Sequence, residues 1–334
     1  MNPLILNVAL LLGSAAVIYF ACEFFVNGVE WVGRRLSVGS TATGTILAAF
    51  GTALPESVVT FVAVAFGGSH AQKDIGVGAA LGGPLVLATV AYAVVGVVLL
   101  VGRQPLKATP DVRRQFKRLS RDQGWFLGIF VVKIGLGLVA FALKPWLGIA
   151  FLAAYAVYFW QEMRHDDGVE AHALEPLRIA PGRAQPSTVL ALLQTGVALA
   201  VIFAASRVFV SQLDALGPAL GLKPQLLALL LSPIATELPE TMNAIIWVRQ
   251  GKHRLALANI SGAMMIQATV PTAFGIFFTP WLLDRSLVLA AAVTTAAVGV
   301  MFIAFRRGVI SRRLLAAMGL FYLLFAGLLV ALRL

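Results

Sequence analysis

Charge and cysteine are both scarce in this sequence. Only 12% of its 334 residues are charged, 59% are hydrophobic, and the mean hydropathy of +0.88 lies outside the range of soluble globular domains. The single cysteine, Cys22, excludes an intramolecular disulfide and any metal site built from several cysteines. The chain is therefore predicted to be a membrane protein whose chemistry depends on other residues.

The motifs of common enzymes are missing as well. The sequence contains no Gly-x-Ser-x-Gly, His-Glu-x-x-His, glycine-rich phosphate loop or Cys/His dyad. Its four histidines fall in predicted loops and lack the spacing of a zinc site. We therefore predict a protein that is not an enzyme and needs no cofactor.

Long polar stretches are absent because apolar runs of roughly 20 residues, the length that crosses a bilayer as a helix, follow one another along the chain. We predict an all-α membrane protein with ten transmembrane helices, the first of them kept rather than removed as a signal peptide. The predicted helices start near Pro3, Ser40, Ile75, Trp125, Trp146, Ser187, Pro224, Leu255, Leu287 and Leu314.

The positions of the basic residues predict the orientation in the membrane. The loops of one side hold 19 Lys and Arg and those of the other side hold 5, and cytoplasmic loops carry the excess. Both termini should therefore lie outside the cytoplasm. Topology also accounts for the net charge of +11 without a nucleic-acid partner. A compact chain without targeting tracts suits a prokaryotic inner membrane.

An internal repeat is the most informative feature of the sequence. The segment Gly51–Glu56 (GTALPE) recurs as Ala235–Glu240 (ATELPE), 184 residues later. Each half holds five predicted helices, and an odd number inverts the second copy relative to the first, as in secondary transporters. We predict a first repeat over residues 1–165 and a second over 187–334, joined by a cytoplasmic loop over 166–186. Their core motifs cover 41–90 and 225–270.

The proline of each Leu-Pro-Glu element predicts a break in an apolar helix. Proline lacks the N–H that would bond four residues back, so Pro55 and Pro239 free the carbonyls of Gly51 and Ala235. Broken helices of this kind form ion sites in transporters. Each copy also supplies a glutamate and a threonine, and hard cations prefer such oxygen donors. These residues are Glu56 and Thr52 in the first copy and Glu240 and Thr236 in the second.

A Pro-Glu step has a structural interpretation too, since it often marks the first turn of a helix, where the helix dipole favours a carboxylate. Against that interpretation alone, Glu56 and Glu240 sit in the middle of predicted spans, at positions related by the repeat. A charged side chain there costs at least about 2.5 kcal/mol. We therefore favour a functional pair.

The two motifs resemble those of the cation/calcium exchanger superfamily, whose repeats carry Gly-Thr-Ser-x-Pro-Glu followed by Gly-Asn-x-x-Gly-Ser-Asn-x-x-Asn. The resemblance implies a sodium/calcium exchanger-like fold of two inverted five-helix repeats. It also implies that Glu56 and Glu240 bind calcium at the centre and that neighbouring hydroxyls and carbonyls bind sodium. Other branches of the superfamily use protons in place of sodium.

The sequence departs from that pattern in the ligand positions. The serine before Leu-Pro is Ala53 in the first copy and Glu237 in the second, so Glu237 is a candidate third carboxylate. In the second motif Asn259 is kept and the last ligand position is Gln267, a candidate neutral ligand. The first copy has lost its oxygen donors there and carries Ala79, Gly83, Pro84 and Leu87. Because carboxylates remain while hydroxyls are missing, coupling to protons becomes attractive.

Three further charges fall inside predicted helices. Glu23 and Arg207 occupy equivalent positions in the two repeats, and we expect them to form a buried ion pair. Lys133 has no evident partner in the sequence, and snorkelling toward the membrane surface would explain it.

We thus predict a secondary antiporter that exchanges calcium or a related cation for sodium or protons by alternating access, with the cation as substrate. One alternative is the same fold carrying another monovalent or divalent cation. The other is a membrane scaffold that transports nothing.

Overall fold

Apolar segments fold as helices here because a backbone surrounded by lipid must satisfy its own hydrogen bonds. The computed structural model describes residues 3–35, 40–103, 110–164 and 174–333, and describes side chains for all of these except 3, 40–52, 110–113, 162–164 and 234–235. The described chain is helical without any strand and forms ten rods. They are α1 (Pro3–Arg35), α2 (Ser40–Phe66), α3 (His70–Val86) continued by a π-helical turn (Leu87–Ala91) and α4 (Tyr92–Val101), α5 (Pro110–Gly137), a 3₁₀ turn (Lys144–Trp146) with α6 (Leu147–Arg164), α7 (Thr188–Leu220), α8 (Pro224–Thr236) with α9 (Leu238–Arg249), α10 (His253–Phe278), α11 (Arg285–Arg307), and α12 (Arg312–Ala317) with α13 (Gly319–Ala331).

The ten rods correspond one to one to the ten predicted transmembrane helices, although α5 begins at Pro110, 15 residues before the predicted start at Trp125. Six helices in the described part of the chain are long and apolar enough to cross a bilayer, judged by length and composition alone. The outside of the bundle carries large apolar side chains, such as Leu12 at 60% exposure and Val189 at 73%. Such a surface suits lipid, and the chain is an integral membrane protein.

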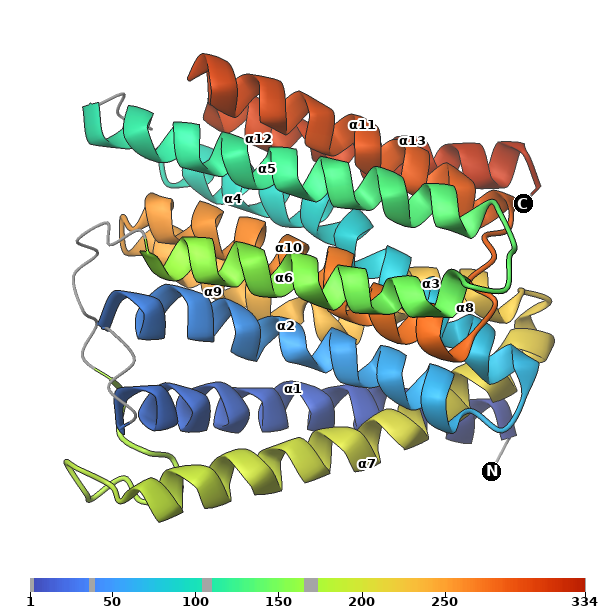
Figure 1. Ribbon diagram of the computed structural model, residues 1–334, viewed down its shortest axis with the longest axis horizontal. Coiled ribbons are helices and arrows are strands. Elements are labelled where there is room, and N and C mark those ends of the chain that lie inside the picture. The colour runs from blue at the N-terminus through green and yellow to red at the C-terminus, as the bar shows by residue number, and fades with distance from the viewer. Residues whose placement is uncertain (1–2, 36–39, 104–109, 165–173, 334) are drawn as a thin grey trace.

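The packing of the rods has the pseudo-twofold symmetry expected of an inverted repeat. The helix α2 packs on α10 in the same way that its counterpart, α8, packs on α3. The packing of α4 on α12 likewise has its counterpart in the packing of α10 on α6. Two helices of the first repeat pack directly on their own counterparts in the second: α1 packs on α7, and α5 packs on α11. Figure 1 shows α1 and α7 along one edge and α5, α11 and α12 along the other. The predicted fold of two inverted five-helix repeats is confirmed.

Both ends of the chain lie at one end of the bundle. In Figure 1, α1 begins and α13 ends on the right, whereas α5 and α7 begin on the left. An even number of membrane crossings produces this arrangement.

Two glycines let α3 approach α8 closely. Gly78 and Gly82 are four residues apart and face the backbone of α8, where a Cβ on Gly82 would come within 2.6 Å of the Leu229 carbonyl oxygen and a Cβ on Gly78 would clash with that of Gln225. This is the small-residue spacing by which membrane helices pack backbone to backbone. This close contact brings α3 of the first repeat against α8, which leads into the Leu-Pro-Glu segment of the second repeat.

Candidate functional site

The two Leu-Pro-Glu elements differ in conformation. In the second repeat the helix breaks at Glu237 (φ −98°, ψ −1°), and α9 restarts with Pro239 and Glu240 in its first turn. In the first repeat, α2 runs without interruption from Ser40 to Phe66 with Pro55 inside it. The predicted break is therefore correct for the second copy and wrong for the first. The second copy has another proline, Pro233, six residues before Pro239, so two helical hydrogen bonds are missing there rather than one.

Four buried polar side chains meet at this break. Glu56 comes from α2, Thr236 from the end of α8, Glu237 from the break and Gln267 from α10, and none of them is more than 1% exposed. The Thr236 hydroxyl lies 2.7 Å from Glu56 Oε2 and 3.2 Å from Glu237 Oε1. Gln267 Nε2 donates to both oxygens of Glu237, at 2.7 and 2.8 Å. We call these four residues the carboxylate cluster.

The carboxylate cluster lacks one positive partner. A threonine hydroxyl has a single hydrogen to donate, yet Thr236 faces both Glu56 Oε2 and Glu237 Oε1 as well as the Ser232 carbonyl oxygen. The other oxygen of Glu56, Oε1, is buried and has no hydrogen-bond partner among the described residues. Because two carboxylates share one hydrogen here, a proton or a metal cation would satisfy the oxygens that remain.

A glycine of the first repeat completes the wall of the cluster. A Cβ on Gly83 would lie 2.8 Å from Gln267 Oε1 and 3.0 Å from Glu237 Oε1. Because Gly83 has no side chain, the space beside it is free for the Glu237 carboxylate and the Gln267 amide of the second repeat. The cluster is asymmetric for this reason.

The remaining predicted ligands are not among the four residues of the carboxylate cluster. Glu240 is fully buried in the first turn of α9, and Asn259 is buried on α10, two turns before Gln267. Neither Asn259 Oδ1 nor Nδ2 forms a hydrogen bond with a described residue. Within the described part of the chain, no three His, Cys, Asp or Glu side chains converge as metal ligands would. The side chains of Gly51, Thr52 and Ala235 lie outside the described set.

Lys133 is a residue whose importance the sequence did not reveal. It is fully buried, so the expected snorkelling is wrong, and its Nζ donates to the Ala80 carbonyl oxygen of α3 at 2.7 Å. The helix α3, which carries Ala80, also packs on α2, the helix of Glu56. A charge inside an apolar helix was a visible signal in the sequence, but its partner is a backbone atom 53 positions away.

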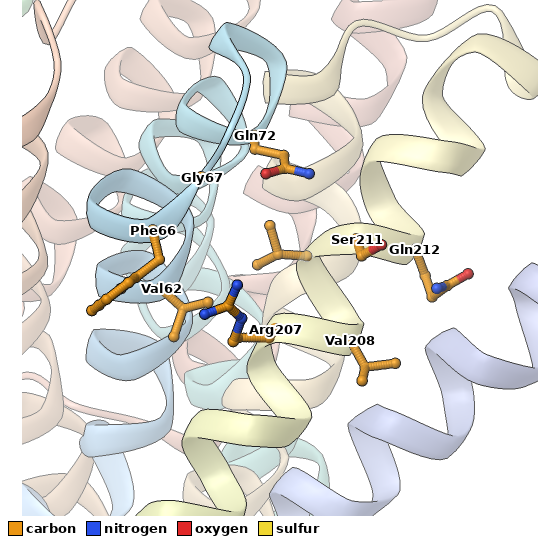
Figure 2. A pocket seen from close by; sticks show the side chains of 9 residues that line it. Val62, Phe66, Gly67, Gln72, Arg207, Val208, Ser211 and Gln212 are labelled. Carbon is orange, nitrogen blue, oxygen red and sulfur yellow. The ribbon is translucent and has the colours of Figure 1, made fainter.

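The ion pair predicted between Glu23 and Arg207 does not form. Glu23 Oε2 lies 3.2 Å from Nη1 of Arg178, which precedes α7. Arg207 lies over the ring of Phe66, 5.9 Å from its centroid, and lines a cavity of about 400 Å³ between the end of α2 and α7 (Figure 2). The arginine in this cavity makes it unsuited to a cation.

The antiparallel packing of α1 and α7 explains the difference (Figure 1). Gly28 contacts Thr195, and Glu23 lies five residues before Gly28, so it faces the part of α7 about five residues after Thr195. Arg207 is a further seven residues along, which is about 10 Å in a helix. Equivalent residues of the two repeats meet only at the pseudo-twofold axis, and these two lie on either side of it.

Comparisons with known proteins agree with the fold. The sequence profile of the family described as "Sodium/calcium exchanger protein" matches residues 6–161 and 190–333. The chain is similar to the inner membrane protein YrbG of Escherichia coli (24% identity, 84% of this chain and 82% of the relative). It is also similar to the putative antiporter CaxA of Alkalimonas amylolytica (25% identity, 85% of this chain and 84% of the relative).

Solved structures show the same architecture. The crystal structure of an H⁺/Ca²⁺ exchanger, CAX, matches with a TM-score of 0.66 at 15% identity, over 98% of this chain and 88% of that protein. The sodium-calcium exchanger NCX_Mj matches with a TM-score of 0.60 at 17% identity, over 97% of this chain and 99% of that protein.

Proposed function

Because the chain belongs to the sodium/calcium exchanger family, we propose that it is a secondary active antiporter that exchanges calcium or a related cation for protons or sodium. The substrate would bind at the carboxylate cluster and at Glu240. Alternating access would expose this region first to one side of the membrane and then to the other.

The observation that carries the proposal is the burial of two carboxylates where the two repeats meet. Glu56 belongs to the first repeat, whereas Thr236, Glu237 and Gln267 belong to the second. A site shared by two inverted repeats changes its access when one repeat rocks against the other. Ionisable groups inside a membrane protein are costly and accordingly mark ion pathways.

The donor set suits a hard cation. Carboxylate, amide and hydroxyl oxygens are the ligands that calcium prefers, and it takes about six to eight of them. The cluster supplies the carboxylate oxygens of Glu56 and Glu237, the Thr236 hydroxyl and Gln267 Oε1, which is buried without a hydrogen-bond partner among the described residues. Glu240 and water would complete the coordination.

The geometry favours protons over sodium as the exchanged ion. A hydroxyl between two carboxylate oxygens, 2.7 and 3.2 Å away, is satisfied on both sides when one carboxylate is protonated. The first repeat has lost the side-chain oxygens with which its motif would hold sodium.

Flux in proteoliposomes tests the proposal. With purified protein, uptake of calcium, manganese or sodium is measured under a pH gradient alone and under a sodium gradient alone. We expect a pH gradient to drive uptake of a divalent cation. Uptake that responds to sodium and ignores pH would contradict the proton coupling, and no gradient-driven flux of any cation would contradict the antiporter itself.

Binding can be tested separately from flux, because a bound cation raises the melting temperature of the protein by mass action. We expect the transported cation to stabilise the wild type and to lose that effect in Glu56→Gln and Glu240→Gln. Glu175→Gln is the matched control, since Glu175 has a side chain 77% exposed, away from the cluster. Equal stabilisation of all four proteins would rule out the glutamates as ligands.

A further inference from the structure

The ammonium of Lys133 occupies a carbonyl that a proline has freed. In a helix the Ala80 carbonyl would accept from the N–H of residue 84, but that residue is Pro84, which has none. Lys133 Nζ takes its place at 2.7 Å. A freed carbonyl inside a broken or kinked membrane helix is the kind of group that binds a cation in transporters, and here the cation is part of the chain.

The surroundings hold this ammonium in place. Nζ lies 5.3 Å from the ring centroid of Phe130 and 5.7 Å from that of Trp281, so two aromatic faces line its slot. Trp281 is fully buried, and its Nε1 donates to the backbone oxygen of Lys133 at 3.1 Å. The lysine is therefore fixed by its own helix, by α3 and by the segment before α11.

Lys133 is close to the carboxylate cluster along α3. Ala80 lies one helical turn before Gly83, and Gly83 forms the wall against Gln267 and Glu237. The helix α3 packs on α2, which carries Glu56, as well as on α8. The ammonium and the carboxylates thus lie in one buried polar region around α3.

Lys133 and Glu237 both break the symmetry of the repeats, with opposite charge. The counterpart of Glu237 in the first repeat is Ala53. The helix α11, which pairs with α5 as its repeat partner, has no charged residue between Arg285 and Arg306. Relative to its own repeat symmetry, the chain therefore carries one extra negative group and one extra positive group.

We propose that Lys133 is a resident cation of the transport site, filling with its ammonium a monovalent-cation subsite made by the freed Ala80 carbonyl. The proposal deepens the antiporter function and rests on it for its meaning in transport. A transported monovalent ion is not needed at this subsite, so one positive charge stays with the protein through the cycle.

Removal of the lysine side chain should reopen the subsite to a free ammonium. Lys133→Ala lacks three methylenes and the amine, which together correspond to n-propylammonium. We expect n-propylammonium chloride to raise the melting temperature of this variant by about 2–5 °C, whereas tetramethylammonium chloride, which has no N–H to donate, should not. The wild type should respond equally to the two salts, because its own ammonium fills the subsite.

Lys223→Ala is the control. Lys223 immediately precedes α8, its side chain is 69% exposed, and its Nζ lies 3.6 Å from Asp284 Oδ2, so its removal opens no buried slot. This variant should respond equally to the two salts, as the wild type does. A response of Lys133→Ala that matches this control would overturn the proposal.

Substrate affinity gives a second measurement. Without the lysine the carboxylates lose a nearby positive charge, so the concentration of transported cation that half-saturates Lys133→Met should fall about tenfold or more. Adding Glu237→Gln to Lys133→Met restores the net charge and should return the value toward that of the wild type.

If Lys133→Met folds and binds the cation as the wild type does, the lysine is structural. If the wild type binds no cation, the antiporter proposal fails, while the n-propylammonium experiment still tests the subsite.

Discussion

At Gly83 the first repeat contacts side chains of the second repeat so closely that a Cβ would clash with them. The cluster places Gln267 Oε1 and Glu237 Oε1 where a Cβ on residue 83 would be. A methyl group there must displace the amide that holds both oxygens of Glu237. The absence of a side chain in the first motif is thus part of the site rather than only a loss.

We expect Gly83→Ala to weaken binding of the transported cation about tenfold, because the shift of Gln267 leaves a buried carboxylate with poorer partners at a cost of about 1–3 kcal/mol. Cation-dependent melting measures this effect. Gly299→Ala is the control, since a Cβ on Gly299 of α11 meets nothing within 4 Å. Equal affinities in the two variants would show that the cluster tolerates the displacement.

At the scale of elements, the two Leu-Pro-Glu segments have the same residues in different backbones. α2 is continuous through Pro55, whereas α8 ends and α9 begins around Glu237. Only the second segment uses its proline to turn a helix end toward the cluster. Their contributions to binding should accordingly differ.

Pro239→Ala should reduce cation affinity more than Pro55→Ala does, by about tenfold. The alanine supplies an N–H that allows the helix to continue through Glu237, which moves the carboxylate away from Thr236 and Gln267. In α2 the same change only adds a hydrogen bond to a helix that is already formed. Titration of each variant by thermal shift compares them, and a larger loss in Pro55→Ala would contradict the asymmetry.

At the scale of the whole molecule, both chain ends lie at one end of the bundle (Figure 1), and the arginine-rich loops predict that this end faces away from the cytoplasm. A C-terminal alkaline phosphatase fusion, which folds only outside the cytoplasm, should be active in a bacterial host. A C-terminal green fluorescent protein fusion should be dark. The reverse result would invert the orientation.

Much of the architecture could be predicted from the sequence, because apolar length and the 184-residue repeat are properties of the chain itself. The ten helices and their inversion followed from these two patterns. Contacts between repeats could not be predicted in the same way. The Glu23–Arg178 pair depends on the register of α1 against α7, and Lys133 binds a backbone oxygen that no side-chain pattern marks. The continuity of α2 through Pro55 runs against the local preference of proline and could not be predicted from it.

The length of α1 and α7 has a consequence for the membrane around the protein. Each has 33 residues, or about 50 Å of helix, whereas a bilayer with its headgroups is about 40–45 Å thick. The pair accommodates this length by leaning or by extending past the headgroups, and it lies along one edge of the bundle (Figure 1). Any rocking of the repeats that changes this lean also changes the hydrophobic thickness the protein presents to lipid. Exchange rates should therefore vary with acyl-chain length in vesicles of otherwise identical composition, so that the bilayer itself contributes to the barrier between the two access states.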